Sequence, residues 1–331
     1  MRTTRTRRLR LGLTALSLTA VLTSCGLGTS GGYVPTAELS GELEDVQLDG
    51  VEVSVGSKNF TEQVLLGKMM VILLESGGAE AEDLTNIPGS SSARQALLEG
   101  IIDFQWEYTG TAWITYMGNT DPVPDVRGQW QAVRDADAEN GLVWSEPAEL
   151  DNTYAFTMTR EKSEQLDVDS LDDLKDLPAK ELSFCVDAEF LARSDGFRPM
   201  LEAYGIPEVP ESRLKTMDAG AIYQAVDNGE CTFGEAFATD GRIPALDLVV
   251  LEDPKPYFPK YNLSGVVNEQ TLQEHPELRP VIAAVTQRLD NETMAELNKR
   301  VDVDGEEPAD VAYDWLLSEG LIRPVSYTHL K

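Results

Sequence analysis

Two runs of sequence decide the fold: GSKNFTEQ at residues 56–63 and EYTGTAW at residues 107–113. The first follows the strand-like run 51–55 and leads into an apolar segment, for which we predict a helix over 61–76. The second follows another strand-like run, which begins at Ile101. Both runs therefore lie where strands end, which is the usual place for ligands in open α/β sheets.

The rest of the chain alternates strands and helices in two series, one before Asp151 and one from Glu181 to about Glu252. Such repetition predicts an α/β fold with mainly parallel sheets, and two series indicate two lobes. We expect the helical segment after Asn268 to cover the first lobe. The predicted strands are 51–55, 101–106, 182–186, 214–217, 232–238 and 246–251, and the predicted helices are 61–76, 90–99, 128–140, 194–204, 219–228, 277–289, 291–301 and 308–319.

Acidic residues dominate the charge of the chain. Its 331 residues include 57 Asp and Glu against 27 Lys and Arg, which gives a net charge of −30. Residues 1–24 carry five arginines and no acids, so the chain without them carries −35. This charge argues against binding to nucleic acids and to anionic lipid surfaces. A well-solvated surface is the simplest explanation, and a negative field that gathers cationic solutes is the alternative.

Both ends of the chain differ in composition from the rest. Residues 1–24 combine five arginines with a short apolar run, as in a secretory signal peptide. They lead into Cys25 through Leu-Thr-Ser, which resembles a bacterial lipobox, so Cys25 would carry a lipid; Sec and Tat export both stay open. Residues 25–49 are rich in glycine and acids and predict a flexible tether. Residues 326–331 continue no pattern, and we interpret them as a non-native tail.

Two cysteines, Cys185 and Cys231, remain after Cys25. An even count in an oxidising compartment favours a disulfide. Both cysteines lie in strand-like runs, however, and on parallel neighbouring strands their sulfur atoms could be too far apart to bond. The sequence leaves both outcomes open. With two histidines in the whole chain, we expect no metal site and no cofactor.

Taken together, these segments closely resemble the substrate-binding proteins of ABC importers for glycine betaine, choline and related quaternary-ammonium osmoprotectants. The resemblance implies a type II periplasmic-binding-protein fold, in which ligand binds between two α/β lobes that close by a hinge motion. We place the two crossings between the lobes near 153–160 and 261–268. Lobe 1 would then comprise residues 50–155 and a return segment 263–325, and lobe 2 would comprise residues 156–262.

The resemblance also implies an aromatic site. A quaternary ammonium group cannot donate a conventional hydrogen bond, so its site needs aromatic faces that attract the charge. Tyr108, Tyr154, Phe237 and Tyr261 match the positions of the family's aromatic box, with Phe237 where tyrosine is usual. Phe156 is close enough in sequence to compete with Tyr154 for its place.

Three further positions match the polar end of the same pocket. Arg193 matches the arginine that meets a betaine carboxylate, and Lys58 and Thr111 match residues that line the same end. An acid in place of the neutral Thr111 would favour choline and repel a carboxylate, so the threonine favours betaines.

The implied function is that of a lipid-anchored, monomeric solute receptor on the outer face of the cell membrane. It would deliver glycine betaine, choline, carnitine or proline betaine to an ABC permease, and the sequence does not rank these ligands. The alternative is a binding protein for another small solute such as an amino acid, whose α-ammonium group would require an acidic partner. An enzyme is not expected, because the sequence offers no credible pair of nucleophile and base.

Overall fold

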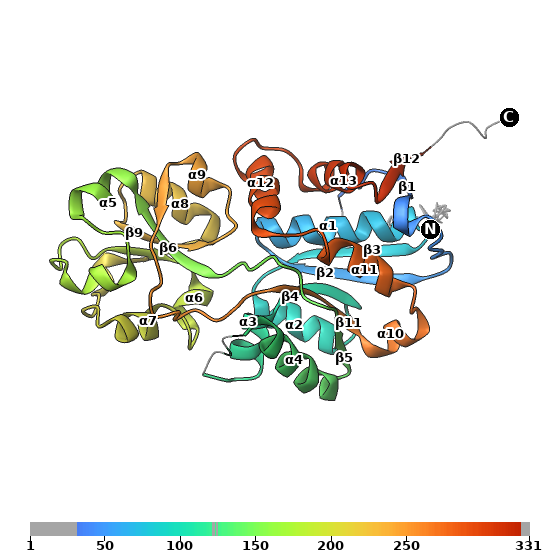
Figure 1. The fold of residues 1–331 in the computed structure, drawn as a ribbon, viewed down its shortest axis with the longest axis horizontal. Coiled ribbons are helices and arrows are strands. Elements are labelled where there is room, and N and C mark those ends of the chain that lie inside the picture. Colours follow the sequence, from blue (N-terminus) through green and yellow to red (C-terminus); the bar gives the residue numbers. More distant parts are fainter. Residues whose placement is uncertain (1–31, 121–122, 124, 326–331) are drawn as a thin grey trace, which may run out of the picture.

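Two five-stranded sheets, each flanked by helices, organise the chain into the two lobes of Figure 1. The structure is a computed structural model that describes residues 32–325, apart from 121, 122 and 124. The predicted signal peptide, the predicted lipidation site Cys25 and the predicted tail at 326–331 lie outside the described residues. The two-lobed α/β architecture expected from the sequence is confirmed.

Lobe 1 is built on a sheet in the order β3-β2-β4-β11-β5. β2 is parallel to β3 and β4, whereas β11 is antiparallel to β4 and β5. β11 has the opposite direction because the chain enters it from lobe 2, at the edge of the sheet where β2 and β4 end. The sheet is therefore more mixed than predicted. The strands are Glu52–Lys58 (β2), Glu80–Ile87 (β3), Phe104–Tyr108 (β4), Leu142–Trp144 (β5) and Leu263–Asn268 (β11).

The edge strand β3 has no counterpart among the predicted strands. Its sequence, EAEDLTNI, places acidic residues where a strand-like run would have apolar ones. An edge strand tolerates them because its outer side faces solvent, and charge there discourages pairing with other chains.

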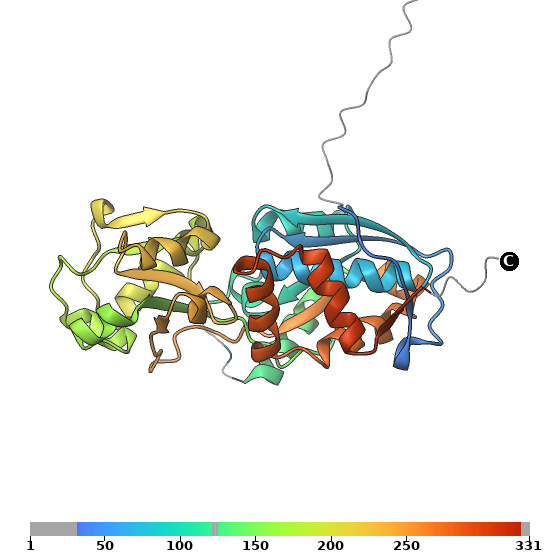
Figure 2. The ribbon, with the colours of Figure 1, turned by 90° about the horizontal axis from the view of Figure 1, so that it is seen from above.

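The helix α1 (Thr61–Ser76) forms the core of lobe 1, and its bounds agree with the predicted helix. It is apolar on nearly all sides, as expected of a helix that is buried all round. Figures 1 and 2 both show the C-terminal helices beside it, so the prediction that the segment after Asn268 covers lobe 1 is confirmed. The remaining helices of the lobe are Ser90–Leu98 (α2), Thr109–Thr111 (α3), Val126–Asp137 (α4), Glu269–Glu274 (α10), Leu278–Thr286 (α11), Asn291–Asp302 (α12) and Pro308–Ser318 (α13), with the short turns Ala112–Tyr116 (η2) and Ala138–Asn140 (η3).

Residues 37–49 belong to the fold, which corrects the predicted tether. The strand β1 (Ala37–Leu39) pairs antiparallel with β12 (Ile322–Pro324), and the turn η1 (Gly41–Leu43) follows it. Leu39, Leu43 and Leu48 are buried in the core of lobe 1. The acidic composition of the segment predicted disorder, but the burial of these three leucines stabilises it. The free energy gained from their burial exceeds the entropic cost of ordering the segment.

Lobe 2 has a sheet in the order β10-β6-β9-β7-β8. The parallel strands β9, β7 and β8 follow the predicted pattern, and β6 is antiparallel to both of its neighbours. The helix predicted over 194–204 corresponds to α7, which begins three residues later and ends at the predicted residue, and the short helix α6 before it was not predicted. The strands are Tyr154–Thr159 (β6), Phe184–Val186 (β7), Leu214–Thr216 (β8), Phe233–Phe237 (β9) and Leu248–Val250 (β10); the helices are Arg160–Leu166 (α5), Ala188–Ala192 (α6), Phe197–Tyr204 (α7), Ala219–Asp227 (α8) and Arg242–Ala245 (α9), with the turns Leu171–Asp176 (η4) and Glu211–Arg213 (η5).

The two crossings between the lobes run side by side as residues 145–153 and 251–262. Asp151 and Asn262 form an antiparallel bridge, and the Asn152 N–H donates to the Tyr261 carbonyl oxygen at 3.2 Å. The crossings were predicted a few residues later, near 153–160 and 261–268, where the chain has already entered β6 and β11. The strand-like sequence of each crossing continues without a break into the strand that follows it, β6 or β11. The sequence pattern therefore did not show where the crossing ends and the strand begins.

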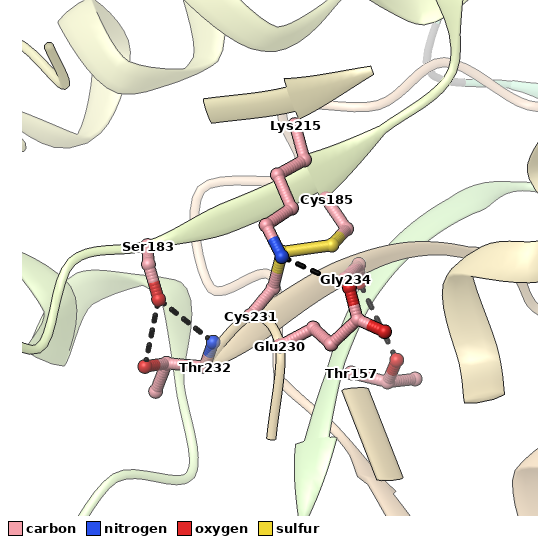
Figure 3. The surroundings of a disulfide bond; sticks show 8 residues. All are labelled: Thr157, Ser183, Cys185, Lys215, Glu230, Cys231, Thr232 and Gly234. Carbon is pink, nitrogen blue, oxygen red and sulfur yellow. Dashed lines mark hydrogen bonds and ion pairs between the residues drawn. A yellow bond between two sulfur atoms is a disulfide. The ribbon is translucent and has the colours of Figure 1, made fainter. Parts of the chain in front are cut away.

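The cysteines of lobe 2 form a disulfide bond between Cys185 on β7 and Cys231. Cys231 lies two residues before β9 begins, outside the ladder of the sheet, so it is free to approach its partner with a Cα–Cα distance of 5.7 Å. The bond is buried against α8, and the exposed ion pair Lys215–Glu230 lies beside it in Figure 3.

Candidate ligand-binding site

A cavity of about 800 Å³ lies between the lobes, where β2 and β4 end and where the two crossings pass. Its wall combines aromatic side chains with buried polar ones. Six of the seven predicted site residues line it, namely Lys58, Tyr108, Thr111, Tyr154, Phe237 and Tyr261.

The four predicted aromatic residues surround this cavity as one group. The ring of Tyr154 lies 5.5 Å from that of Phe237 and 5.4 Å from that of Tyr261, the latter edge to face. Phe60 also belongs to the group, with ring distances of 5.3 Å to Phe237 and 6.3 Å to Tyr108. We did not predict Phe60, although it lies in the run 56–63, two residues beyond Lys58.

Strand register explains part of this grouping. Tyr154 and Phe237 are directly opposite each other in the antiparallel pair β6–β9, so their side chains emerge side by side. Phe156 lies two residues further along the same face of β6, where it is fully buried among Phe184 and Phe197. Of the two residues, Tyr154 lines the cavity and Phe156 does not.

A glycine lets the second crossing pass close to the turn that follows β4. Gly110 follows the end of β4, and a Cβ atom built on it would lie 2.7 Å from the Tyr261 ring and 2.8 Å from the Lys260 carbonyl oxygen. Any side chain at position 110 would therefore displace the second crossing from the wall of the cavity.

Arg193 lies behind the aromatic wall and does not line the cavity itself. Its Nε and Nη2 donate to the two Asp195 carboxylate oxygens at 2.7 Å each, and Nη2 also donates to the Tyr261 hydroxyl at 2.9 Å. Its guanidinium carbon lies 5.2 Å from the Tyr154 ring centre and 5.7 Å from that of Tyr261. Nη1 is buried and has no hydrogen-bond partner among the described residues.

Lys58 is buried and already paired. Its Nζ lies 2.5 Å from Glu107 Oε1 and 4.7 Å from the Tyr108 ring centre. The other Glu107 oxygen accepts a hydrogen bond from the Tyr116 hydroxyl at 2.6 Å. The Lys58 charge is thus balanced by its own carboxylate, while Thr111, 5% exposed, adds a neutral side chain to the wall.

A buried carboxylate, not predicted from the sequence, lies beside Tyr108. Glu62, 2% exposed, accepts hydrogen bonds at Oε1 from the Tyr108 hydroxyl (2.6 Å) and Asn152 Nδ2 (3.0 Å). At Oε2 it accepts from the Thr239 hydroxyl (2.5 Å) and Asn298 Nδ2 (3.1 Å). Burial raises the pKa of Glu62, and these four donors oppose the shift. Burial and the negative Glu62 hold the pKa of Tyr108 well above its usual value, so the phenol keeps its proton.

The lobes are closed over the cavity. Thr239 of lobe 2 reaches Glu62, and Glu189 of lobe 2 accepts hydrogen bonds from the Ser90 hydroxyl at 2.6 Å and the Ser90 N–H at 3.1 Å. At the opposite edge, Arg242 Nη2 lies 3.2 Å from Asp302 of α12. These contacts join the lobes around the cavity, where Tyr108, Tyr154 and Tyr261 are buried and Phe60 and Phe237 are half-buried.

Two general features of the described residues bear on function. They include no group of three or more His, Cys, Asp and Glu side chains that could hold a metal ion. Within the same residues, no helix is both long enough and apolar enough to cross a membrane.

Comparison with known proteins assigns the family. The profile of the OpuAC family, described as the substrate-binding domain of ABC-type glycine betaine transport systems, matches residues 51–318. The chain is 37% identical over 276 residues to the glycine-betaine-binding protein of Pseudomonas aeruginosa, covering 81% of this chain and 88% of that protein. It is 29% identical to the glycine betaine-binding protein YehZ of Escherichia coli, covering 81% and 90%. A solved structure described as a glycine betaine/carnitine/choline ABC transporter matches with a TM-score of 0.66 and 26% identity, covering 80% of this chain and 98% of that one. The chain therefore belongs to the family of substrate-binding domains of ABC-type glycine betaine transport systems.

Proposed function

We propose that the protein captures a small quaternary-ammonium solute of the glycine betaine, carnitine or choline type and delivers it to an ABC permease. As a member of this family it is a transport receptor that works outside the cytoplasm, and not an enzyme. The observation that carries the proposal is the group of five aromatic rings around one cavity, contributed by both lobes and a crossing: Phe60, Tyr108, Tyr154, Phe237 and Tyr261.

The rings suit the chemistry of the cation. A trimethylammonium group is bulky and weakly hydrated, so each aromatic face that it touches contributes about 0.5–2 kcal/mol. Several such faces together give useful affinity without a hydrogen bond to the cation. Because the rings come from both lobes, the full set of contacts forms when the lobes close.

The polar end supports a ligand that carries a carboxylate. Nη1 of Arg193 makes no hydrogen bond in the described residues and has only Glu189 Oε1 at 3.7 Å as an ion-pair partner, and Thr111 leaves the wall neutral where an acid would repel an anion. An amino acid is a weaker candidate, because Glu62 and Glu189, two of the acids that line the cavity, already accept hydrogen bonds from the protein.

The same proposal includes a lipid anchor at Cys25 and action as a monomer. The lipobox-like sequence before Cys25 supports the anchor, and residues 26–36 would connect it to lobe 1. Incorporation of labelled fatty acid into the wild-type protein but not into Cys25→Ser, together with the mass of the purified mature chain in solution, would test both statements.

Calorimetric titration tests the ligand. The purified mature chain should bind at least one of glycine betaine, choline, carnitine and proline betaine with a Kd below about 1 mM, which corresponds to about −4 kcal/mol. Tyr261→Ala should weaken that binding, whereas Tyr313→Ala on α13, away from the cavity, should not. Binding of an amino acid but of none of the four quaternary ammonium compounds would refute the proposal.

A further inference from the structure

Glu62 is a buried charge that the aromatic group alone does not explain. All four of its hydrogen-bond partners are neutral, and no lysine or arginine of the described residues forms an ion pair with it. Lys58, the nearest basic residue in sequence, forms its ion pair with Glu107 instead. Burying a carboxylate without an opposite charge costs several kcal/mol, so the fold retains it at a substantial expense in stability.

The surroundings of Glu62 favour the ionised carboxylate. Each oxygen accepts from one amide N–H group, of Asn152 or Asn298, which can only donate, and from one hydroxyl, of Tyr108 or Thr239; this set of partners suits an anion. Glu62 also lies in the first turn of the 16-residue helix α1, where the helix dipole favours negative charge.

The charge is placed where the ligand would be. Glu62 and Tyr108 both line the cavity, and the phenol of Tyr108 donates to Glu62 Oε1. A phenol that donates to a carboxylate gains electron density, which makes its ring face more attractive to a cation. Glu62 therefore acts on the cavity in two ways, through the Tyr108 ring and through its own field, and the burial of Glu62 and Tyr108 limits the screening of both by water.

We propose that Glu62 is the counter-charge of the bound cation, and that it selects a charged ammonium ligand over a neutral molecule of the same shape. This inference rests on the proposed function and extends it, because it assigns the selectivity for charge to one carboxylate outside the aromatic group. Glu62 acts on the ligand through Tyr108 and across the cavity, so it is a positioning and electrostatic residue.

A purely structural role for Glu62 makes a different prediction. Thr239 belongs to lobe 2 and Asn298 to α12 of lobe 1, and Asn298 also donates to the Thr239 carbonyl oxygen at 3.0 Å. Glu62 could thus serve only to hold the lobes together. In that case its loss would weaken every ligand by the same factor, whatever the ligand's charge.

Isosteres that lack the ammonium charge separate the two roles. In 3,3-dimethylbutan-1-ol a carbon replaces the ammonium nitrogen of choline, which gives a neutral molecule. In 3,3-dimethylbutanoate the same replacement in glycine betaine leaves an anion without the positive charge. We would measure the affinity of each pair by calorimetric competition in the wild-type chain and in Glu62→Gln. The inference predicts that Glu62→Gln weakens the member with the ammonium group about tenfold or more and the member without it less than about threefold, since about 1.4 kcal/mol corresponds to tenfold.

Asn298→Ala is the matched control, because it removes one donor from Glu62 and one contact between the lobes but leaves the charge in place. It should weaken both members of a pair by similar factors. Equal losses for both members in Glu62→Gln, or no loss in either, would overturn the inference while leaving the proposed function intact. A wild-type chain that binds no quaternary ammonium compound would instead refute the proposed function.

Tyr108→Phe provides a second route, and it is needed if Glu62→Gln does not fold or if the isosteres bind too weakly to measure. The variant keeps the ring and removes the hydroxyl that meets Glu62. Its loss of affinity for the cationic ligand should exceed its loss for the isostere. Where isosteres do not bind, the losses in Glu62→Gln and Tyr108→Phe should fail to add in the double variant, and simple additivity would contradict the coupling.

Discussion

Tyr154 and Phe237 face each other across the antiparallel pair β6–β9, with ring centres 5.5 Å apart, and both side chains reach the cavity between the lobes. Phe156 lies two residues along the same strand but points into the core of lobe 2. The strand β6 therefore carries a candidate ligand contact, Tyr154, and a core packing residue, Phe156, at neighbouring positions on the same face.

Substitutions on this strand should separate affinity from stability. Tyr154→Ala should weaken binding of a quaternary ammonium ligand about 3- to 30-fold, which is the loss of one cation–π contact. Phe156→Leu should lower the free energy of unfolding and leave the affinity of the folded protein unchanged. Calorimetry and urea unfolding of both variants would check this, and the reverse assignment of effects would show that Phe156 occupies the site.

Thr111 should control the preference between betaines and choline. Thr111→Asp places a negative charge in the wall of the cavity, which repels a ligand carboxylate and attracts a ligand that is only cationic. We expect the ratio of choline affinity to glycine betaine affinity to rise roughly tenfold. Thr111→Asn has nearly the same shape without the charge, and a similar ratio in both variants would exclude an electrostatic cause.

Glu235 should make the stability of lobe 2 depend on pH. Burial, reinforced by the nearby negative Asp187, raises the pKa of Glu235 well above its usual value, and Oε1 has no partner among the described residues. Because the folded state holds this proton more tightly than the unfolded chain does, the contribution of Glu235 to the free energy of unfolding falls as the pH rises above about 4.5.

Glu235→Gln removes this titration and still offers an oxygen to the Asp187 N–H, which now donates to Glu235 Oε2 at 2.7 Å. The variant should therefore match the wild type near pH 4.5 and exceed it at pH 8, by about 1.4 kcal/mol for each unit of pKa shift within that interval. Urea unfolding at the two pH values measures the difference. A constant difference at both pH values would mean that Glu235 does not titrate in this range.

The Cys185–Cys231 bond should stabilise lobe 2 without affecting the ligand site. The two residues are 46 positions apart in sequence. Closing a loop of this length reduces the entropy of the unfolded chain, which stabilises the folded state by about 4 kcal/mol at 25 °C. The double variant Cys185→Ser/Cys231→Ser should lose stability of this order in urea unfolding. The reduced wild type should lose a similar amount, and affinities measured well below the unfolding transition should stay the same; weaker ligand binding in the folded variant would contradict this separation.

The features that could be predicted from the sequence are those that depend on a local pattern of residues. The helix α1 has the bounds that its apolar run and its glycine stop indicate, and the resemblance to a known family located the aromatic residues at strand ends. The strand β3 and the segment 37–49 were missed because acidic residues mask their few buried positions, and only the packed lobe shows which of these face the core.

The polar part of the site depends on contacts that no local pattern contains. Asn298 donates to Glu62 from 236 residues away, and Thr239 does so from 177 residues away. Each of these residues alone is an ordinary polar residue in a turn or on a helix. Their common partner emerges only when the second lobe and the C-terminal helices are folded against α1.

The pairing of β1 with β12 joins both ends of the described chain to lobe 1, far from the cavity. A receptor attached to the membrane through Cys25 would thus be held by lobe 1, with 12 residues from Cys25 to Ala37 and a reach of at most about 40 Å. Lobe 2 would then be linked to the membrane only through lobe 1 and the two crossings. In such a receptor lobe 1 is the stationary body, and the opening and closing that a permease detects is a movement of lobe 2.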